Sequence, residues 1–476
     1  MASIINILLT YKKAAEVTAG QWVTTPNDEM LSLSGAAFDS RQLGEAEIFF
    51  TLEGARDAHD FLPSLVGSNI KLVVVTKDVP ALKGMAILKV TDSLKALQDL
   101  ASHQAQQAQA KIIAITGSSG KTTAKAWLNY LLSPHFKVQA SPGSFNNHIG
   151  CPVTILDLEQ DTEILILEMG TNGLGELDLL SSIGLADFTL LLNVGHAHVG
   201  KFGSFENTYK AKLEIFNHQK AGALSIVPHF DPKILDQTQH LKPITFGAGG
   251  DYSAVVLATE NYSQTLELTT PKVKYQFTLN QLGEYVGSTF AALAVILEHF
   301  GVLGLTLQTL KLPQEKGRST LLKSGLGATL LDDTYNANPE SVINMLTTLA
   351  SLSEETKVGV IGNLGELDED LATTASLIVD NIPAGITHLF FTGASGELLA
   401  PLVVAKYPDI TTEFCPSLKN LFQKIEPLNR EGVAIGVKGS RAAHLERIIL
   451  LLGGRQINCL VESCFHLKNC GSCGEL

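Results

Sequence analysis

The chain has 476 residues, a formal net charge of −13, 45% hydrophobic residues and 17% charged residues. This length exceeds what one core needs, so about two to four domains are expected. The hydrophobic content excludes an intrinsically disordered protein, and the acidic balance argues against a nucleic-acid groove, which would need a basic face. A nucleotide ligand is not excluded, because one lysine and a few backbone N–H groups suffice to bind phosphate.

The N-terminus carries a short apolar run, Ile4–Leu9, without a preceding basic region or a clear small-residue cleavage site. This pattern predicts the start of a folded domain and not a signal peptide. No uncharged apolar run approaches the ~20 residues needed to cross a membrane. We therefore expect a cytoplasmic protein.

The segment Ile70–Thr76 predicts a buried strand. After it, Ser93–Ala110 has helical spacing and then becomes polar, as expected of a helix that links two domains. From Lys111 on, short apolar runs alternate with helical patterns, which predicts a parallel sheet covered on both faces. The runs are Ile112–Thr116, Glu163–Gly170, Asp187–Gly195 and Ala223–Pro228.

The pattern changes at Asp251–Leu279, where polar and β-branched residues alternate and antiparallel strands are expected. A helix is predicted over Ser288–Phe300. Four apolar runs then restart the alternation of strand and helix and predict a third, smaller α/β domain. They are Ala328–Tyr335, Lys357–Leu364, Thr387–Ala394 and Gly432–Ser440.

The predicted fold is α/β with three domains and a tail. We expect a small N-terminal α/β domain over 1–92 and a central domain with a doubly wound, mostly parallel sheet over 93–315. A C-terminal Rossmann-like α/β domain is expected over 316–452, followed by the tail at 453–476. Hinges are expected near residues 92 and 315, because ligands held by several domains imply closure.

The tail is rich in cysteine. Its cysteines are Cys459, Cys464, Cys470 and Cys473. Disulfides are not expected in a cytosolic chain. One Cys-x-x-Cys pair with His466 nearby permits a zinc site, although a second well-spaced pair is missing. The alternative is a poorly ordered segment after the last helix.

The stretch Lys111–Thr123, KIIAITGSSGKTT, resembles a phosphate-binding loop between a strand and a helix. A full Walker A motif is G-x-x-x-x-G-K-[ST]; here Ile115 occupies the first glycine position, so the loop is the shorter GSSGKT. Backbone N–H groups and the helix N-terminus would face phosphate oxygens. Lys121 would neutralise the outer phosphates and Thr122 would bind Mg²⁺. The alternative is a glycine-rich turn without a ligand.

Polar residues follow three other segments of the predicted central domain. Asn146 and Asn147 precede a turn, and His196 and His198 follow the end of a strand. Glu168 ends an apolar strand, and ligands bind at the carboxyl ends of parallel strands. A metal role for Glu168 is therefore favoured over a purely structural one.

Together these motifs resemble the Mur ligases over about residues 30–452, in the same order along the chain. The motifs are TGSSGKTT, NNHIGCP, the EMG strand end, NVGHAHVGKFGS followed by KAKLEIF, LDDTYNANPES and VKGSR. The N-terminal FDSRQL and DAHDF are similar to the uridine-nucleotide domain of that family. The loop alone is shared with folylpolyglutamate synthetases, whereas DTYNANP is like the motif of the members that add D-alanyl-D-alanine.

The resemblance implies an ATP-dependent amide ligase. Such ligases bind a UDP-sugar peptide on the N-terminal domain and ATP on the central P-loop, and the C-terminal domain closes over both. The expected partners are UDP-N-acetylmuramoyl-tripeptide and D-alanyl-D-alanine, with ATP and Mg²⁺ as cofactors, and the expected state is a monomer. A terminal carboxylate would become an acyl phosphate that an amine attacks, giving a pentapeptide precursor of peptidoglycan, ADP and phosphate.

The resemblance also implies roles for individual residues. The ATP phosphates would be bound by Gly117, Ser118, Ser119, Gly120, Lys121, Thr122 and Thr123. The metal ligands would be Thr122, Glu168, His198 and Lys212, and the catalytic residues Lys121, His198 and Lys212. Ser40 and Arg41 would bind the uridine diphosphate, Asn146 and Asn147 the sugar peptide, and Arg318, Asp333, Tyr335 and Asn336 the ATP side. Lys212 matches a lysine that is carbamylated in related ligases, with Lys210 as the competing assignment; the roles of Lys438 and Arg441 stay open.

The sequence departs from the family pattern in segments that recognise substrates. Tyr285, Val286 and Thr289 replace the His, Asn and Asn that the family often has before the last central helix, so adenine recognition must differ. Leu52-Glu53-Gly54 replaces Leu-Lys-Gly, and Val199-Gly200 replaces Leu-Glu. The core chemistry is expected to be intact.

Two other functions stay open. One is a related ligase with another amine or acid, such as the diaminopimelate-adding relative, whose Asp-Asn-Pro-Arg motif does not occur here. The other is a catalytically silent nucleotide-binding paralogue, which would need no second metal site. The third residue of the tripeptide, diaminopimelate or lysine, cannot be read from the sequence.

Overall fold

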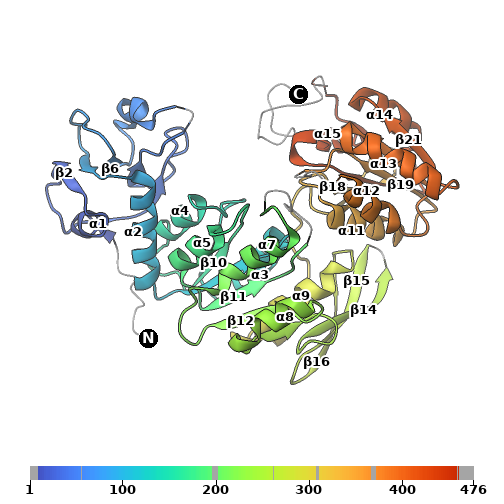
Figure 1. Cartoon of the computed structure of the whole chain (residues 1–476), viewed down its shortest axis with the longest axis horizontal. Helices are drawn as coiled ribbons and strands as arrows, with labels where there is room; N and C mark the ends of the chain where they lie inside the picture. The colour runs from blue at the N-terminus through green and yellow to red at the C-terminus, as the bar shows by residue number, and fades with distance from the viewer. Residues whose placement is uncertain are drawn as a thin grey trace. The chain divides into compact units, whose positions relative to one another are not determined.

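The computed structural model describes residues 9–54, 56–195, 202–260, 262–306, 310–365, 371–457 and 459. The chain divides into two compact units. The first comprises Met1–Gly117, Leu128–Asn193 and Tyr209–Ile244; the second comprises Ser118–Trp127, Val194–Thr208 and Thr245–Leu476. Figure 1 labels their elements. Across the described part of the chain, no helix has the length and apolarity needed to span a membrane.

The first unit contains a five-stranded sheet in the N-terminal part of the chain, in the order β2-β7-β6-β5-β4. Its strands are β2 (Gln21–Thr24), β4 (Ala36–Ala37), β5 (Ile48–Phe50), β6 (Leu72–Val75) and β7 (Ala86–Lys89). Only β2 is antiparallel to its neighbour. Strand β6 reads LVVV and is buried at every position, which confirms the predicted strand and explains its β-branched composition. The remaining elements here are β1 (Leu9–Thr10), α1 (Tyr11–Thr18), β3 (Ser32–Leu33) and the 3₁₀ helix η1 (Ala58–Leu65).

Helix α2 (Ser93–Gln107) is the predicted linking helix. Asp92 caps it by accepting a hydrogen bond from the Lys95 backbone N–H at 2.9 Å. It packs against α1, α4 and α5. Leu97 and Leu100 lie on its buried face, so α2 is part of a core and not a bare connection.

The central sheet has six strands in the order β13-β12-β11-β8-β10-β9. They are β8 (Lys111–Thr116), β9 (Val138–Ala140), β10 (Ile164–Glu168), β11 (Phe188–Leu191), β12 (Leu224–Pro228) and β13 (Ile244–Phe246). The pairs of β8 with β10 and β11, of β10 with β9 and of β11 with β12 are parallel, as predicted. The accompanying helices are α3 (Lys121–Leu132), α4 (Gly150–Leu156), α5 (Glu176–Gly184), α7 (Phe205–Leu213), α8 (Pro232–Thr238), η2 (Glu214–Phe216) and η3 (Gln239–Leu241).

The second unit contains the predicted antiparallel segment, a sheet in the order β14-β15-β16. Its strands are β14 (Ser253–Glu260), β15 (Ser263–Thr269) and β16 (Lys274–Leu279). Helix α9 (Tyr285–His299) packs against this sheet and begins three residues before the predicted start at Ser288. The short helix α10 (Leu303–Thr306) follows.

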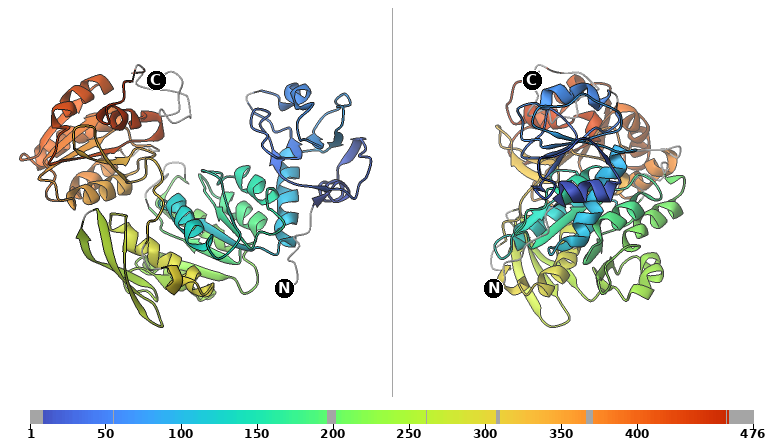
Figure 2. Two further views of the ribbon diagram at one scale, coloured as in Figure 1. Left: turned by 180° about the vertical axis from the view of Figure 1, so that it is seen from behind. Right: turned by 90° about the vertical axis from the view of Figure 1, so that its left-hand side faces the viewer.

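The C-terminal sheet has six strands in the order β17-β18-β22-β19-β20-β21, and all but β17 are parallel to their neighbours. They are β17 (Thr320–Lys323), β18 (Thr329–Asp333), β19 (Thr356–Ile361), β20 (His388–Thr392), β21 (Thr411–Cys415) and β22 (Val433–Lys438). One core is formed with residues of α11 (Pro339–Ala350), α12 (Leu371–Asp380) and α13 (Gly393–Lys406). A second core is formed with α14 (Leu418–Ile425) and α15 (Glu446–Leu452). Two separate cores make this a doubly wound α/β sheet, which Figure 2 shows from behind. The short 3₁₀ helices η4 (Glu426–Leu428) and η5 (Arg441–Ala443) complete this part.

The observed fold confirms the predicted α/β class. The N-terminal, central and C-terminal sheets each fall inside one of the predicted ranges, whereas the boundaries at 92, 315 and 452 stay predictions. In the tail, residues 458 and 460–476 lie outside the described residues, and so does the proposed zinc site.

Helix α11 begins with a capping box. The Asn338 side chain accepts a hydrogen bond from Ser341 N at 2.9 Å, and the Ser341 hydroxyl accepts one from Asn338 N at 3.0 Å. We expect Asn338→Ala to lower the free energy of unfolding by about 1 kcal/mol, because it removes a helix cap. Urea denaturation would measure this. Asn344→Ala, on the exposed side of the same helix, is the control and should change stability by less; equal losses would contradict the capping role.

Candidate active site

The predicted phosphate-binding loop starts at the middle of the central sheet. Strand β8 ends at Thr116 between the ends of β10 and β11. Its Ile115 carbonyl accepts a hydrogen bond from Met169 N at 2.9 Å, and its Thr116 carbonyl accepts one from Leu192 N at 2.9 Å. The loop therefore leaves the carboxyl edge of a parallel sheet, where ligands bind in such folds.

The loop itself has the backbone of a strand-to-helix turn. Gly120 has φ 81°, a left-handed conformation that favours glycine, and α3 starts at the next residue, Lys121. The Gly120 carbonyl accepts a hydrogen bond from Ala124 N at 2.9 Å. Ser118 Oγ accepts one from Gly195 N at 2.9 Å. Thr122 is buried, whereas Ser118, Ser119, Gly120, Lys121 and Thr123 are half-buried.

Glu168 is the last residue of β10 and only 1% exposed. Its Oε1 accepts a hydrogen bond from Asn146 Nδ2 at 2.8 Å, and the Asn146 carbonyl accepts one from Gly170 N at 2.7 Å. A carboxylate is costly to bury unless cations or donors compensate it. This buried carboxylate at a strand end therefore fits a hard cation such as Mg²⁺.

Asn147 has a local structural partner that the sequence interpretation missed. Its Oδ1 accepts hydrogen bonds from Ile149 N at 3.1 Å and Gly150 N at 2.8 Å, at the start of α4. Asparagine shortly before a helix is a known capping signal, so NNHIGCP itself could have indicated this role. Of the two asparagines predicted to contact the sugar peptide, Asn146 thus donates to Glu168 and Asn147 accepts hydrogen bonds at the N-terminus of α4. Their contact with substrate stays a prediction.

The structure distinguishes the two candidate lysines of α7. Lys212 is 1% exposed and among the largest fully buried side chains, whereas Lys210 is exposed. Glu214, two residues on, accepts hydrogen bonds from Gly175 N at 2.8 Å and Asp178 N at 3.2 Å. Glu214 thereby ties the end of α7 to the start of α5, a link the sequence did not indicate. Burial favours Lys212 over Lys210 for a role in a site.

His196 and His198 lie outside the described residues, so the predicted metal ligand His198 has no described position. Among the residues that are described, no group of three or more His, Cys, Asp or Glu side chains gathers as a metal site would require. The predicted metal ligands are Thr122, Glu168, His198 and Lys212. Among the described residues of this set, Glu168 is the only His, Cys, Asp or Glu side chain.

The predicted uridine-binding residues lie on an exposed turn. Arg41 donates hydrogen bonds to Asp39 from Nε at 2.8 Å and from Nη2 at 2.6 Å. These hydrogen bonds lower the pKa of Asp39 to about 2. The Arg41 side chain is 84% exposed, so it is accessible to an anion that can compete with Asp39. Ser40 is half-buried beside it.

The DAHDF motif has a structural role. His59 Nε2 accepts a hydrogen bond from Thr76 N at 3.2 Å, so its proton is on Nδ1, which lies 2.6 Å from Asp57 Oδ1. A short hydrogen bond from Lys77 also lowers the pKa of Asp57. His59 therefore connects the end of β6 to the turn before η1.

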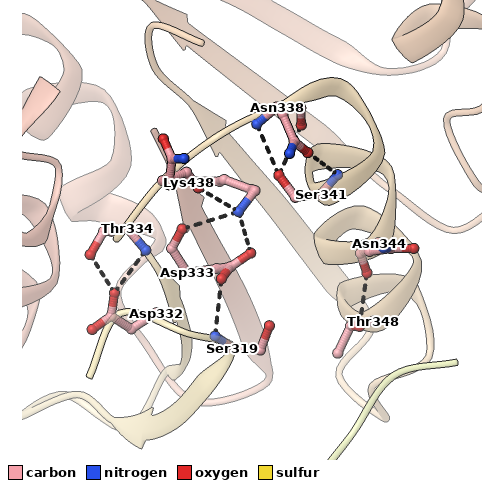
Figure 3. Close-up of polar contacts among 10 residues, drawn as sticks. Ser319, Asp332, Asp333, Thr334, Asn338, Ser341, Asn344, Thr348 and Lys438 are labelled. Atoms are coloured by element: carbon pink, nitrogen blue, oxygen red, sulfur yellow. Dashed lines mark hydrogen bonds and ion pairs between the residues drawn. The ribbon is translucent and has the colours of Figure 1, made fainter. Parts of the chain in front are cut away.

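Contacts connect the residues predicted for the ATP side of the C-terminal domain, and Figure 3 shows those of Asp333 with Ser319 and Lys438. Ser319 N donates a hydrogen bond to Asp333 Oδ1 at 3.1 Å. The Arg318 guanidinium lies 4.0 Å from the centre of the Tyr335 ring, a cation–π contact. Tyr335 N donates to the Gly317 carbonyl at 3.0 Å. The segment before β17 and the segment at the end of β18 thus lie side by side.

Of the two residues whose roles the sequence left open, Lys438 contacts these residues, whereas Arg441 pairs with Glu446. Lys438 Nζ lies 2.6 Å from Asp333 Oδ2 and donates to the Asn336 carbonyl at 2.8 Å. Arg441 Nη1 donates to Glu446 Oε1 at 2.8 Å, and its side chain is 26% exposed. Sequence reasoning identified the motif but not the pairing, which joins residues more than 100 positions apart.

In the segment where the family pattern places adenine contacts, two of the three substituted side chains are buried. Val286 and Thr289 are buried in α9. Burial raises the pKa of the Tyr285 hydroxyl to about 12. The Tyr285 hydroxyl is therefore neutral at ordinary pH. Tyr285 lies near enough to Asp333 for the charge of that carboxylate to contribute to the raised pKa.

A glycine-rich strand-to-helix turn at the edge of a parallel sheet, a buried glutamate at a strand end and a second, Rossmann-like sheet are the features expected of a nucleotide-binding α/β protein. Residues 115–296 match the family model of the Mur ligase middle domain, and residues 317–441 match that of the Mur ligase, glutamate ligase domain. The UDP-N-acetylmuramoyl-tripeptide–D-alanyl-D-alanine ligase of Bacillus subtilis is 30% identical over 451 residues, covering 92% of this chain and 97% of the relative. The chain belongs to the Mur ligase family.

Solved structures agree with this assignment. A crystal structure of MurF from Acinetobacter baumannii has a TM-score of 0.84 at 28% identity, covering 95% of this chain and all of that chain (100%). A MurF ligase from Thermotoga maritima, solved in complex with ADP, shares the fold with a TM-score of 0.76 at 24% identity, covering 89% and 97% of the two chains. The family predicted from the motifs is therefore confirmed.

Proposed function

We propose that this chain joins D-alanyl-D-alanine to UDP-N-acetylmuramoyl-tripeptide at the expense of ATP. The observation that carries this assignment is the 30% identity with the Bacillus subtilis ligase over 97% of that enzyme. The GSSGKT loop, Glu168 and the DTYNANP segment agree with it, because an amide ligase must bind nucleotide, a cation and an activated acid.

The reaction needs activation because a carboxylate is a poor electrophile. A carboxylate oxygen of the tripeptide attacks the γ-phosphorus of ATP, and the bond from that phosphorus to the oxygen of ADP breaks. The amine of D-alanyl-D-alanine then attacks the acyl carbon, loses a proton, and expels phosphate. Nearly all of the catalysis in phosphoryl transfer comes from position and charge.

The chain's own residues supply these two contributions. The backbone N–H groups of the loop and the first turn of α3 would hold the phosphates, and Lys121 would neutralise charge on the transferred group. Arg318, Asp333, Tyr335 and Asn336 would contact the nucleotide from the C-terminal sheet. Ser40 and Arg41 would hold the diphosphate of the UDP-sugar, with Arg41 exchanging Asp39 for the ligand.

Magnesium fits this site because Glu168 is a buried carboxylate at the end of a parallel strand. We assign Thr122 and Glu168 to one ion, and His198 and a carbamylated Lys212 to a second. The ions would neutralise phosphate charge during transfer. Carbamylation turns a buried cation into an anion, which accounts for a fully buried lysine in a site that holds cations.

Phosphate release from ATP tests the function. The unmodified protein would be incubated with the UDP-muramoyl tripeptide and D-alanyl-D-alanine, together and separately. We expect release only when both are present, and a pentapeptide product by mass spectrometry. Release with the UDP-muramoyl dipeptide and an amino acid instead would identify a different Mur-type ligase. ADP binding without release for any pair would identify a catalytically silent paralogue.

A further inference from the structure

Lys438 is a charged residue in an otherwise apolar strand. Strand β22 reads VAIGVK, is buried at all six positions, and lies between β18 and β19 in the sheet. Lys438 is its last residue and 2% exposed. Lysine is almost never fully buried unless it is paired, so its partners explain its position.

The Lys438 ammonium group donates hydrogen bonds to three acceptors of the protein itself. Its contacts are Asp333 Oδ2 at 2.6 Å, the Asn336 carbonyl at 2.8 Å and the Asp333 carbonyl at 3.5 Å. Figure 3 shows the Lys438 side chain directed at Asp333. An ammonium has three protons to donate, and three acceptors surround this one. Lys438 is therefore not placed to contact a ligand directly.

The contact follows from the topology of the sheet. Asp333 and Lys438 are register partners at the ends of the parallel strands β18 and β22. The Lys438 carbonyl accepts a hydrogen bond from Gly362 N at 2.8 Å, after the end of β19. Lys438 thus lies where three strand ends meet, at the edge of the sheet that binds ligands in this kind of fold.

Stability alone does not account for this ion pair. Removing two charges from water costs about as much as their attraction returns, so apolar residues of similar volume often serve a fold equally well. The pair instead fixes geometry. Asp333 Oδ2 is held by Lys438 and Oδ1 by Ser319 N, so the carboxylate cannot rotate. Lys438 contacts Asn336 through the backbone carbonyl, so the exposed Asn336 side chain can contact a ligand.

We propose that Lys438 is a positioning residue for the nucleotide: it orients Asp333 and the Asn336 backbone so that the DTYNANP loop is ready to bind ATP. This inference rests on the proposed function, because that function assigns Asp333 and Asn336 to the ATP side. Lys438 acts through these residues and does not contact the reacting groups.

The test is calorimetric titration of ADP with Mg²⁺ into the unmodified protein, Lys438→Met, Asp333→Asn and the double variant. We expect Lys438→Met to weaken ADP binding about tenfold, by analogy with metal sites, where loss of a residue that supports a ligand costs about 10-fold to 100-fold. The double variant should bind no more weakly than the weaker single variant, because both changes disable one unit. In the ligase assay, the KM for ATP should rise and the KM for D-alanyl-D-alanine should stay within about twofold.

Lys424→Met is the matched control. Lys424 lies on α14, and its Nζ is 2.6 Å from Oε1 of Glu413 on β21, but both side chains are exposed, at 44% and 40%. This variant should bind ADP like the unmodified protein. Unchanged ADP binding by a folded Lys438→Met variant, or losses that multiply in the double variant, would overturn the proposal.

The experiment also covers a Lys438→Met variant that does not fold and a protein that binds ADP but has no ligase activity. If Lys438→Met alone does not fold, the double variant, which leaves no unpaired carboxylate, is compared with Asp333→Asn; equal ADP affinity supports the proposal and a further tenfold loss contradicts it. If the unmodified protein binds ADP but releases no phosphate with both substrates, the proposed function fails while the ADP titration still decides the role of Lys438.

Discussion

Lys121→Ala is expected to reduce turnover to about 1% or less and to leave the fold intact. Lys121 begins α3 directly after the left-handed Gly120 and is half-buried, so its loss removes a charge from the loop and not a core residue. Removing one charge-stabilising group from a reaction site costs about 100-fold to 1,000-fold in rate. Phosphate release with both substrates measures the loss, and circular dichroism with thermal unfolding verifies the fold.

Lys95→Ala is the control for the loss of a lysine. Lys95 lies on α2, and its exposed side chain forms a surface ion pair with Asp99 at 2.8 Å. Such pairs contribute little to stability, so this variant should retain activity. Full activity of Lys121→Ala would mean that GSSGKT is not the phosphate-binding loop of this enzyme.

Lys212→Ala is expected to lose activity and to regain part of it with acetate or formate. A carbamylated lysine supplies a carboxylate-like group, and a small acid can occupy the space that truncation of this fully buried side chain leaves. We expect a loss of about 100-fold or more, as for other groups that stabilise charge in a transition state. Initial rates at increasing acetate concentration would show the recovery.

Lys210→Ala, on the same helix, distinguishes the two candidate lysines. Lys210 is exposed, so its removal should leave the rate nearly unchanged. Loss of activity in Lys210→Ala with an active Lys212→Ala would transfer the role to Lys210. Failure of acetate and formate to restore any activity in a folded Lys212→Ala variant would count against carbamylation.

Three of the strands that the sequence did not indicate lie at sheet edges. Strands β9, β17 and β21 are terminal in their sheets, and none is fully buried. Half-exposed strands carry mixed residues and lack the apolar run that marks a buried strand such as β10. A search for hydrophobic runs therefore missed these three strands. It also missed the short inner strands β5 and β7, although they are mostly buried.

The sequence by itself determined the features that are encoded locally. The apolar runs at β8, β10 and β22, the GSSGKT loop and the glutamate at a strand end all follow from neighbouring residues, because burial and turn chemistry act over a few positions. Tertiary structure alone decided which side chains meet. Asn146 reaches Glu168 across 22 residues and Lys438 reaches Asp333 across 105, and no local pattern encodes such contacts. They exist because parallel strands distant in the chain end at the same edge of one sheet, so the order of the strands determines the partners of each polar residue there.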